Sequence, residues 1–154
     1  MKDFIIPVDF SETSLNAARY AASMLGGRAD SRVILYNMFK NEEEAETAGQ
    51  YLESLKAELE QKGVANIENV KEFGTDLIDN LGRLAYQKTA ELIIMKKKKK
   101  DEWHQLFTGS NTVKMAEQNV STVMIIPQSA KYSGITNIVL TSDFKDVENT
   151  TPEL

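Results

Sequence analysis

The chain has 154 residues, of which 42% are hydrophobic and 27% charged, so it can bury the core of one ordinary domain but not of two. This composition excludes a disordered or fibrous protein. The net charge of −5 disfavours a general nucleic-acid or anionic-membrane binder. The absence of cysteine excludes disulfides, thiolate metal sites and cysteine nucleophiles, and a single histidine, His104, excludes a multi-histidine metal site within one chain.

The amino terminus lacks the features of an export signal. Asp3 and Pro7 interrupt the continuous apolar stretch that a secretion signal needs. No apolar run approaches the roughly 20 residues that span a bilayer. We therefore expect a cytoplasmic protein without a membrane partner.

Short apolar runs alternate with longer stretches of helical period, which is typical of a parallel sheet covered by helices. In chain order the expected elements are a strand at 4–8, a helix from Ser11 to Gly26, a strand at 33–36, a helix opening at Glu42, a strand at 67–73, a helix starting at 74–76, a strand at 92–95, a helix at 110–118 and a strand at 122–126. Ser11 is the expected N-cap of the first helix, whose expected inner face is Leu15, Ala18, Ala22 and Leu25.

Five strands joined by helical crossovers predict an α/β fold with an open, doubly wound parallel sheet and helices on both faces. The strand order 3-2-1-4-5 places the third strand, which is the most polar, at an edge of the sheet. In this order the winding reverses between the first and fourth strands. We therefore expect a ligand crevice between the turn at 7–11 and the loop at 96–110.

The end of the sequence resembles its beginning. Residues 138–144 match residues 4–10 at a constant offset of 134, with an apolar run followed by Asp-Phe in both copies. A chance match is the alternative, because an apolar run followed by Asp is common in parallel sheets. We expect one domain at 1–130, followed at 131–154 by a linker and the truncated start of a second, similar domain.

Residues 2–130 resemble the universal stress protein family in four motifs and in the order of these motifs along the chain. They are Ile-Pro-Val-Asp-Phe-Ser at 6–11, Leu-Ile-Ile-Met at 92–95, Gly-Ser-Asn-Thr-Val-Lys at 109–114 and Thr-Val-Met-Ile-Ile-Pro at 122–127. The family's fold is the doubly wound sheet predicted above. Tandem-domain members with the Gly-Ser-Asn-Thr form of the motif are familiar in it.

The resemblance also implies a nucleotide site, with one departure. Nucleotide-binding members carry Gly-x2-Gly-x9-Gly-Ser/Thr after the fourth strand, where glycine backbone wraps the phosphates. Here Lys96 and Lys99 stand at the first two glycine positions. The implied contacts are Pro7, Asp9 and Met38 around base and ribose, Met95 at the strand end, and Gly109, Ser110 and Asn111 at the helix start. The resemblance thus implies that the part of the site that contacts the base is intact, whereas the part that contacts the phosphates is altered.

The lysine run at 96–100 has three interpretations. It is a solvated loop, because five adjacent positive charges repel one another. Alternatively, its lysines bind phosphate as point charges beside the Ser110 helix start. The third interpretation is a patch for an acidic partner or nucleic acid, which the lack of further aromatic residues beyond Trp103 and Phe107 disfavours.

The remaining candidate residues do not favour an enzymatic function. Asp9 either binds a ligand's ribose or base or caps the helix after it. Ser110 is an N-cap rather than a nucleophile, since only His104 can serve as a base near neutral pH and nothing places it nearby. His104 is an exposed loop residue, and Trp103 and Phe107 anchor that loop. The acidic run at 42–44 is a solvated helix start, so we expect neither catalytic residues nor a metal.

Three hypotheses follow for function. The first is a non-enzymatic stress-response or interaction module with weak or lost nucleotide binding and no cofactor. The second is an ATP-binding switch or slow ATPase that uses residues 96–100 for the phosphates, and the third, a flavoprotein, lacks the expected phosphate loop after the first strand. The partner protein is unknown and nucleic acid is not expected. We expect a homodimer, or pairing with a second domain, through the fifth strand: Thr122, Val123, Met124, Ile125 and Ile126.

Overall fold

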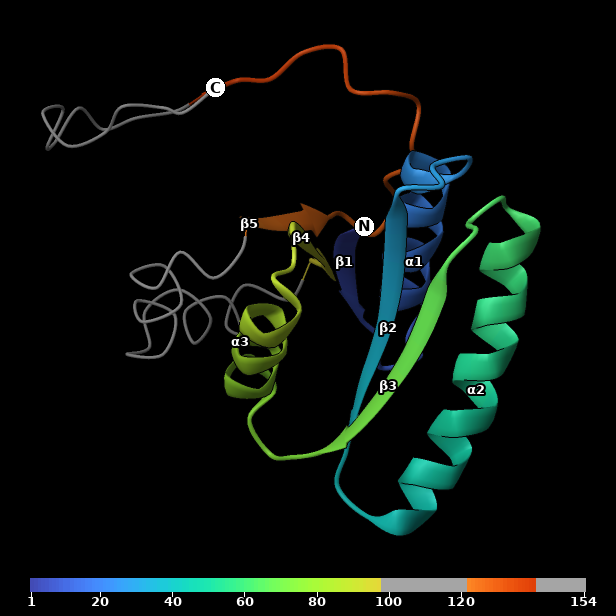
Figure 1. Cartoon of the computed structure of the whole chain (residues 1–154), viewed down its shortest axis with the longest axis vertical. Coiled ribbons are helices and arrows are strands. Elements are labelled where there is room, and N and C mark those ends of the chain that lie inside the picture. Colours follow the sequence, from blue (N-terminus) through green and yellow to red (C-terminus); the bar gives the residue numbers. More distant parts are fainter. Residues whose placement is uncertain (98–121, 141–154) are drawn as a thin grey trace, which may run out of the picture.

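The computed structural model describes residues 1–97 and 122–140 (Figure 1). Its elements are β1 (Lys2–Pro7), α1 (Glu12–Leu25), β2 (Ser31–Phe39), α2 (Glu42–Gln61), β3 (Ile67–Phe73), α3 (Leu77–Lys88), β4 (Leu92–Lys96) and β5 (Thr122–Ile126). The predicted strands all form, although β2 extends beyond 33–36 at both ends. The helix expected at 110–118 lies outside the described residues.

The five strands form one parallel sheet in the order β3-β2-β1-β4-β5, which confirms the predicted fold class. The central strand β1 pairs with β2 from Lys2↔Ser31 to Pro7↔Tyr36, and with β4 at Phe4↔Leu92 and Ile5↔Ile93. The winding reverses between β1 and β4. A crevice is therefore expected at the carboxyl ends of these two strands.

Helices cover both faces of the sheet, and each face has its own core (Figure 1). Side chains of α1 and α2 pack with Ile6, Leu35 and Ile94 on one face. Leu81, Leu84 and Ala85 of α3 pack with alternate strand residues on the other face. The alternation along β2 puts Val33 and Leu35 on the α1/α2 face, and Ile34 and Tyr36 on the α3 face.

The inner face of α1 differs from the prediction. Leu15 is only partly buried, and the buried positions are Ser14, Ala17, Ala18, Ala21, Ala22 and Leu25. Ser14 turns inward because its hydroxyl donates to the Ser11 carbonyl at 3.0 Å and accepts from the Asp9 amide at 3.3 Å. The small side chains on this face let α1 lie close against the sheet.

After β5 the chain returns along α1. Asn16 donates to the carbonyls of Pro127 and Ala130 at 3.3 and 3.1 Å, and the rings of Tyr20 and Tyr132 meet edge to face at 5.4 Å. Residues 138–140, the described part of the sequence repeat, are exposed and lie outside the sheet. None of the three described helices is both long and apolar enough for a membrane crossing.

Candidate functional site

A cleft of about 220 Å³ opens where the sheet reverses its winding, at the carboxyl ends of β1, β2 and β4. Five residues predicted for a ligand site line it together: Pro7, Asp9, Met38, Met95 and Lys96. Its other walls are Val8, Tyr36, Asn37 and Leu77. The predicted site residues Lys99, Gly109, Ser110 and Asn111 lie outside the described residues, as do His104, Trp103 and Phe107.

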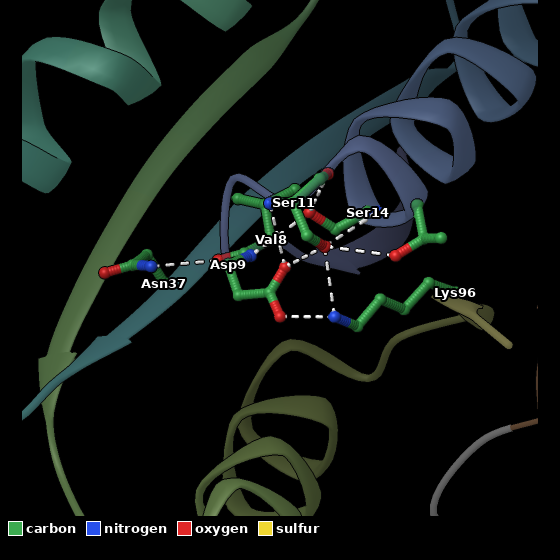
Figure 2. A network of polar contacts seen from close by, with 7 residues as sticks. Val8, Asp9, Ser11, Ser14, Asn37 and Lys96 are labelled. Carbon is green, nitrogen blue, oxygen red and sulfur yellow. Dashed lines mark hydrogen bonds and ion pairs between the residues drawn. The ribbon is translucent and has the colours of Figure 1, made fainter. Parts of the chain in front are cut away.

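The side chain of Lys96, which lines this cleft, points toward Asp9 and Ser11 in the turn after β1 (Figure 2). Lys96 is the last residue of β4, and its side chain is 22% exposed. Its ammonium forms an ion pair with the Asp9 carboxylate and donates to the Ser11 hydroxyl at 3.1 Å. The side chain of Lys96 is therefore bound to the turn after β1 rather than extended into solvent.

The turn after β1 holds the Asp9 carboxylate in place. Its Oδ1 accepts from the Ser11 hydroxyl at 2.5 Å and from the Ser11 amide at 3.1 Å, which also initiates α1. Phe10 between them has a φ of 61°, a left-handed conformation that a bulky residue adopts only at a cost of about 1 kcal/mol. Asn37 of β2 fixes the start of the turn by donating to the Val8 carbonyl at 2.9 Å.

The pKa of Asp9 reflects two opposed influences. Burial raises this pKa, but the hydrogen bonds from Lys96, Ser11 and Ser14 lower it by more, and the pKa lies well below its usual range. The carboxylate is therefore charged throughout the neutral range. Its charge is directed at Lys96, so Asp9 is not available as a proton donor.

Replacing Lys96 with methionine should raise the pKa of Asp9 toward its ordinary value. The folded pKa lies below the unfolded one, so the ion pair stabilises the fold above about pH 4 and loses this effect as the pH falls through the folded pKa. Carbon-detected NMR titration of the aspartate carboxyls measures the midpoint in both proteins. An unchanged midpoint in Lys96→Met would show that Lys96 does not set the charge of this carboxylate.

The inner walls of the cleft are largely apolar. Met38, Leu77 and Met95 form its sides, and Tyr36 closes one side with its hydroxyl donating to Glu72 at 3.0 Å. Burial and the Glu72 carboxylate raise the pKa of Tyr36 to about 12, so the phenol stays neutral. Such walls suit a flat, uncharged group.

Sequence reasoning missed the cleft walls Val8, Tyr36, Asn37 and Leu77, as well as Ser14. Two of these residues carried a sequence signal. Ser14 follows Ser11 by one helical turn, a spacing that places both hydroxyls at the same helix end. Asn37 is a lone amide in an otherwise apolar stretch of β2, and that break in the pattern was the available signal. Within 1–97 and 122–140, no group of three or more histidine, aspartate and glutamate side chains is arranged to hold a metal ion.

Residues 1–127 match the model of the universal stress protein family. The chain belongs to this family. Among curated proteins, no match was found.

Solved structures share the fold of this universal stress protein domain. A universal stress protein in complex with cAMP aligns with a TM-score of 0.65 at 19% identity, over 83% of this chain and 98% of that one. UspA from Lactobacillus plantarum aligns with a TM-score of 0.60 at 16% identity, over 81% of this chain and 97% of that one. The universal stress protein from Archaeoglobus fulgidus in complex with dAMP also aligns with a TM-score of 0.60 at 16% identity, over 81% of this chain and 97% of that one.

Proposed function

We propose that this chain is a non-enzymatic, cytoplasmic stress-response module that acts through protein contacts and binds nucleotide weakly or not at all. The contact of Lys96 with Asp9 and Ser11 carries the proposal. The resemblance to nucleotide-binding members implies glycine at the position of Lys96 and places Asp9 around the base and ribose. The Lys96 ammonium would therefore compete with a ligand's hydroxyl groups for the Asp9 carboxylate.

The composition of the cleft supports the same proposal. A volume of about 220 Å³ falls below the roughly 300–1,000 Å³ of ordinary small-molecule sites. The hydroxyl of Ser11 is engaged by Asp9, and the only histidine lies outside the described residues. The described cleft thus offers neither an activated nucleophile nor a neutral-range base.

Thermal unfolding with and without ATP and Mg²⁺ tests this function. A ligand that binds only the native state raises the melting temperature by mass action. We expect no shift at millimolar ATP, AMP or adenosine. A saturable rise of several degrees would overturn the proposal.

A nucleotide-binding switch is the second candidate, and the position of Lys96 favours it in one respect. Lys96 lines the cleft, so its ammonium could bind a phosphate there if it left Asp9. Structural neighbours in complex with cAMP and dAMP are consistent with an adenine in the apolar part. This candidate requires the temperature shift that the first one excludes.

We also expect the chain to form a homodimer through β5. Among the described strands β5 pairs with β4 alone, and Val123 on it is 39% exposed. An apolar edge strand of this kind pairs readily with its equivalent in a second copy. Sedimentation equilibrium at micromolar concentration should show a dimer, and Val123→Lys should shift it toward monomer. A wild-type chain that is only monomeric would refute this expectation.

A further inference from the structure

Residues 135–140 form an apolar segment that runs clear of the sheet (Figure 1). Its four large apolar side chains are all more than half exposed: Ile135, Ile138, Val139 and Leu140. The Ile-Val-Leu run at 138–140 matches Phe-Ile-Ile at 4–6 of β1, and such continuous runs are typical of strands buried on both faces. The segment thus has the sequence of a buried strand, but no described strand pairs with it.

The segment cannot reach the β3 edge of its own sheet. The ring of Tyr132 contacts Tyr20 of α1, a helix that contacts β4 more than any other strand. Neighbouring strands lie about 4.8 Å apart, so a position beyond β3 is about 19 Å from β4. The chain from residue 132 to residue 135 spans at most about 11 Å.

The segment does not suit a position beyond its own β5 either. Residues 127–134 run back over the α1 face, where Asn16 donates to the carbonyls of Pro127 and Ala130. A parallel strand beyond β5 would be joined to it over this face in the direction opposite to the β1–α1–β2 connection. That crossover would be left-handed, and about 98% of such connections are right-handed. The sheet edge that fits the segment therefore belongs to a second copy.

The edge of β3 is open to a further strand. Among the described strands β3 pairs with β2 alone, and an edge strand presents unpaired N–H and C=O groups. Its charged side chains are bound within their own domain, because Glu68 and Glu72 pair with Lys88 and Arg83 of α3, and Lys71 donates to a carbonyl of α2. These charges are thus held over the two faces of the sheet, and the β5 edge is the one expected to form the dimer.

Asn69 of β3 carries an acceptor without a partner. Its Nδ2 donates to the Glu53 carboxylate of α2 at 2.8 Å, and a carboxylate can only accept, so this bond sets the orientation of the amide. The Oδ1 of Asn69 is buried and has no hydrogen-bond partner in the part of the chain that the structure describes. A buried acceptor of this kind is costly, so a donor on a neighbouring strand would stabilise it.

One parallel register matches the segment to β3. In this register Asn137 lies beside Asn69, and asparagines at the same position of neighbouring strands form side-chain ladders in which one amide donates to the next. The two isoleucines of the segment then lie beside Ile67 and Val70, which are partly buried against the two cores. The antiparallel direction with the same asparagine pair would place both isoleucines beside charged residues.

We infer that residues 135–140 of one chain add as a parallel strand to the edge of β3 in a second copy. This pairing would give backbone partners to both strands, cover exposed apolar side chains and supply a donor to Asn69. The inference goes beyond the proposed function, and it uses the sheet edge that a dimer through β5 leaves free.

Disulfide formation between two single-cysteine variants tests the inference, since the chain has no cysteine of its own. When an Ile138→Cys chain and a tagged Val70→Cys chain are mixed and mildly oxidised, we expect a mixed disulfide, because adjacent strands bring Cα atoms into disulfide range. Phe73→Cys is the matched control on the same strand, exposed but about 10 Å farther along, and should link at least fivefold more slowly. Thermal unfolding verifies the fold, and Val139→Cys with Lys71→Cys, the next pair in the register, replaces a Val70→Cys chain that does not fold.

A second variant tests the asparagine pair. Asn137→Asp keeps the shape of the side chain but cannot donate at neutral pH, so in the Ile138→Cys chain it should slow the linkage about fivefold. Ser133→Asp adds the same charge just outside the segment and should leave the rate unchanged. An equal effect of the two substitutions would overturn the inferred register.

The β5 edge supplies the remaining outcomes. Val123→Lys, which should disrupt the dimer through β5, should leave the linkage between Ile138→Cys and Val70→Cys intact, so the two contacts can fail separately. The inference is overturned if Phe73→Cys links as fast as Val70→Cys, if Val123→Lys abolishes the linkage, or if a Val123→Cys chain captures Ile138→Cys faster than Val70→Cys does.

Discussion

Replacing Lys96 with glycine is expected to give this protein measurable affinity for adenosine and AMP. The substitution removes the ammonium from Asp9 and Ser11, which frees the carboxylate for the hydroxyl groups of a ribose. It also supplies the glycine that the resemblance to nucleotide-binding members implies at the end of β4, so backbone can approach a phosphate. A ligand at about ten to a hundred times its Kd adds roughly 1.4–2.7 kcal/mol to the free energy of unfolding. In a domain of this size the melting temperature then rises by about 3–10 °C.

Two variants separate the effects of position and of charge. Lys97→Gly removes the neighbouring lysine, which is exposed and does not line the cleft, and this variant should not respond to AMP. Lys96→Met removes the ammonium without creating a glycine, so it should bind adenosine but gain little from a phosphate. If wild type responds to ATP as strongly as Lys96→Gly does, Lys96 binds phosphate rather than closing the cleft. If Lys96→Gly binds neither adenosine nor AMP, Lys96 is not the residue that closes the cleft to a nucleotide.

The fold was predictable because it depends on short-range patterns. Continuous apolar runs predict strands buried on both faces, as β1 and β4 are, and the alternating polar run at 67–73 predicts the edge position of β3. The handedness of crossovers then leaves few strand orders. On the inner face of α1, the prediction was confirmed at Ala18, Ala22 and Leu25 but wrong at Leu15, and it missed Ser14, Ala17 and Ala21. These small residues carry little apolar signal, and their burial depends on close contact with the sheet.

The location of the candidate site was predictable from the sequence, but the side-chain contacts within it were not. Topology alone located the crevice at the ends of β1 and β4. The pairing of Lys96 with Asp9 joins residues 87 positions apart, and the sequence equally allowed a solvated lysine. The contact of the Phe10 ring with Tyr51 had no sequence signal either, since the two residues come from separate elements.

Removing Arg32 should produce the largest loss of stability among single substitutions of charged residues in the described part of the chain. Arg32 on β2 lies beside Asp3 on β1, and its Nε and NH2 groups bind the two carboxylate oxygens at 2.9 and 2.6 Å. The hydrogen bonds that Arg32 donates to Asp3 raise the pKa of Arg32, so its guanidinium stays charged. The Asp3 side chain is 5% exposed, so without its partner a charge remains buried at the start of the central strand.

Arg32→Met should therefore lower the free energy of unfolding by about 3–5 kcal/mol, since a buried charge without its partner is strongly destabilising. This is a large part of the roughly 5–15 kcal/mol that stabilises an ordinary domain, and urea unfolding measures it. Arg19→Met is the matched control, because its bonds to Glu58 at 2.6 and 3.1 Å have similar geometry but both side chains are more than a third exposed. That pair should contribute less than about 1 kcal/mol. Adding Asp3→Asn to Arg32→Met should recover much of the loss, because the amide is neutral, and equal losses in Arg32→Met and Arg19→Met would show that burial of Asp3 is not the cause.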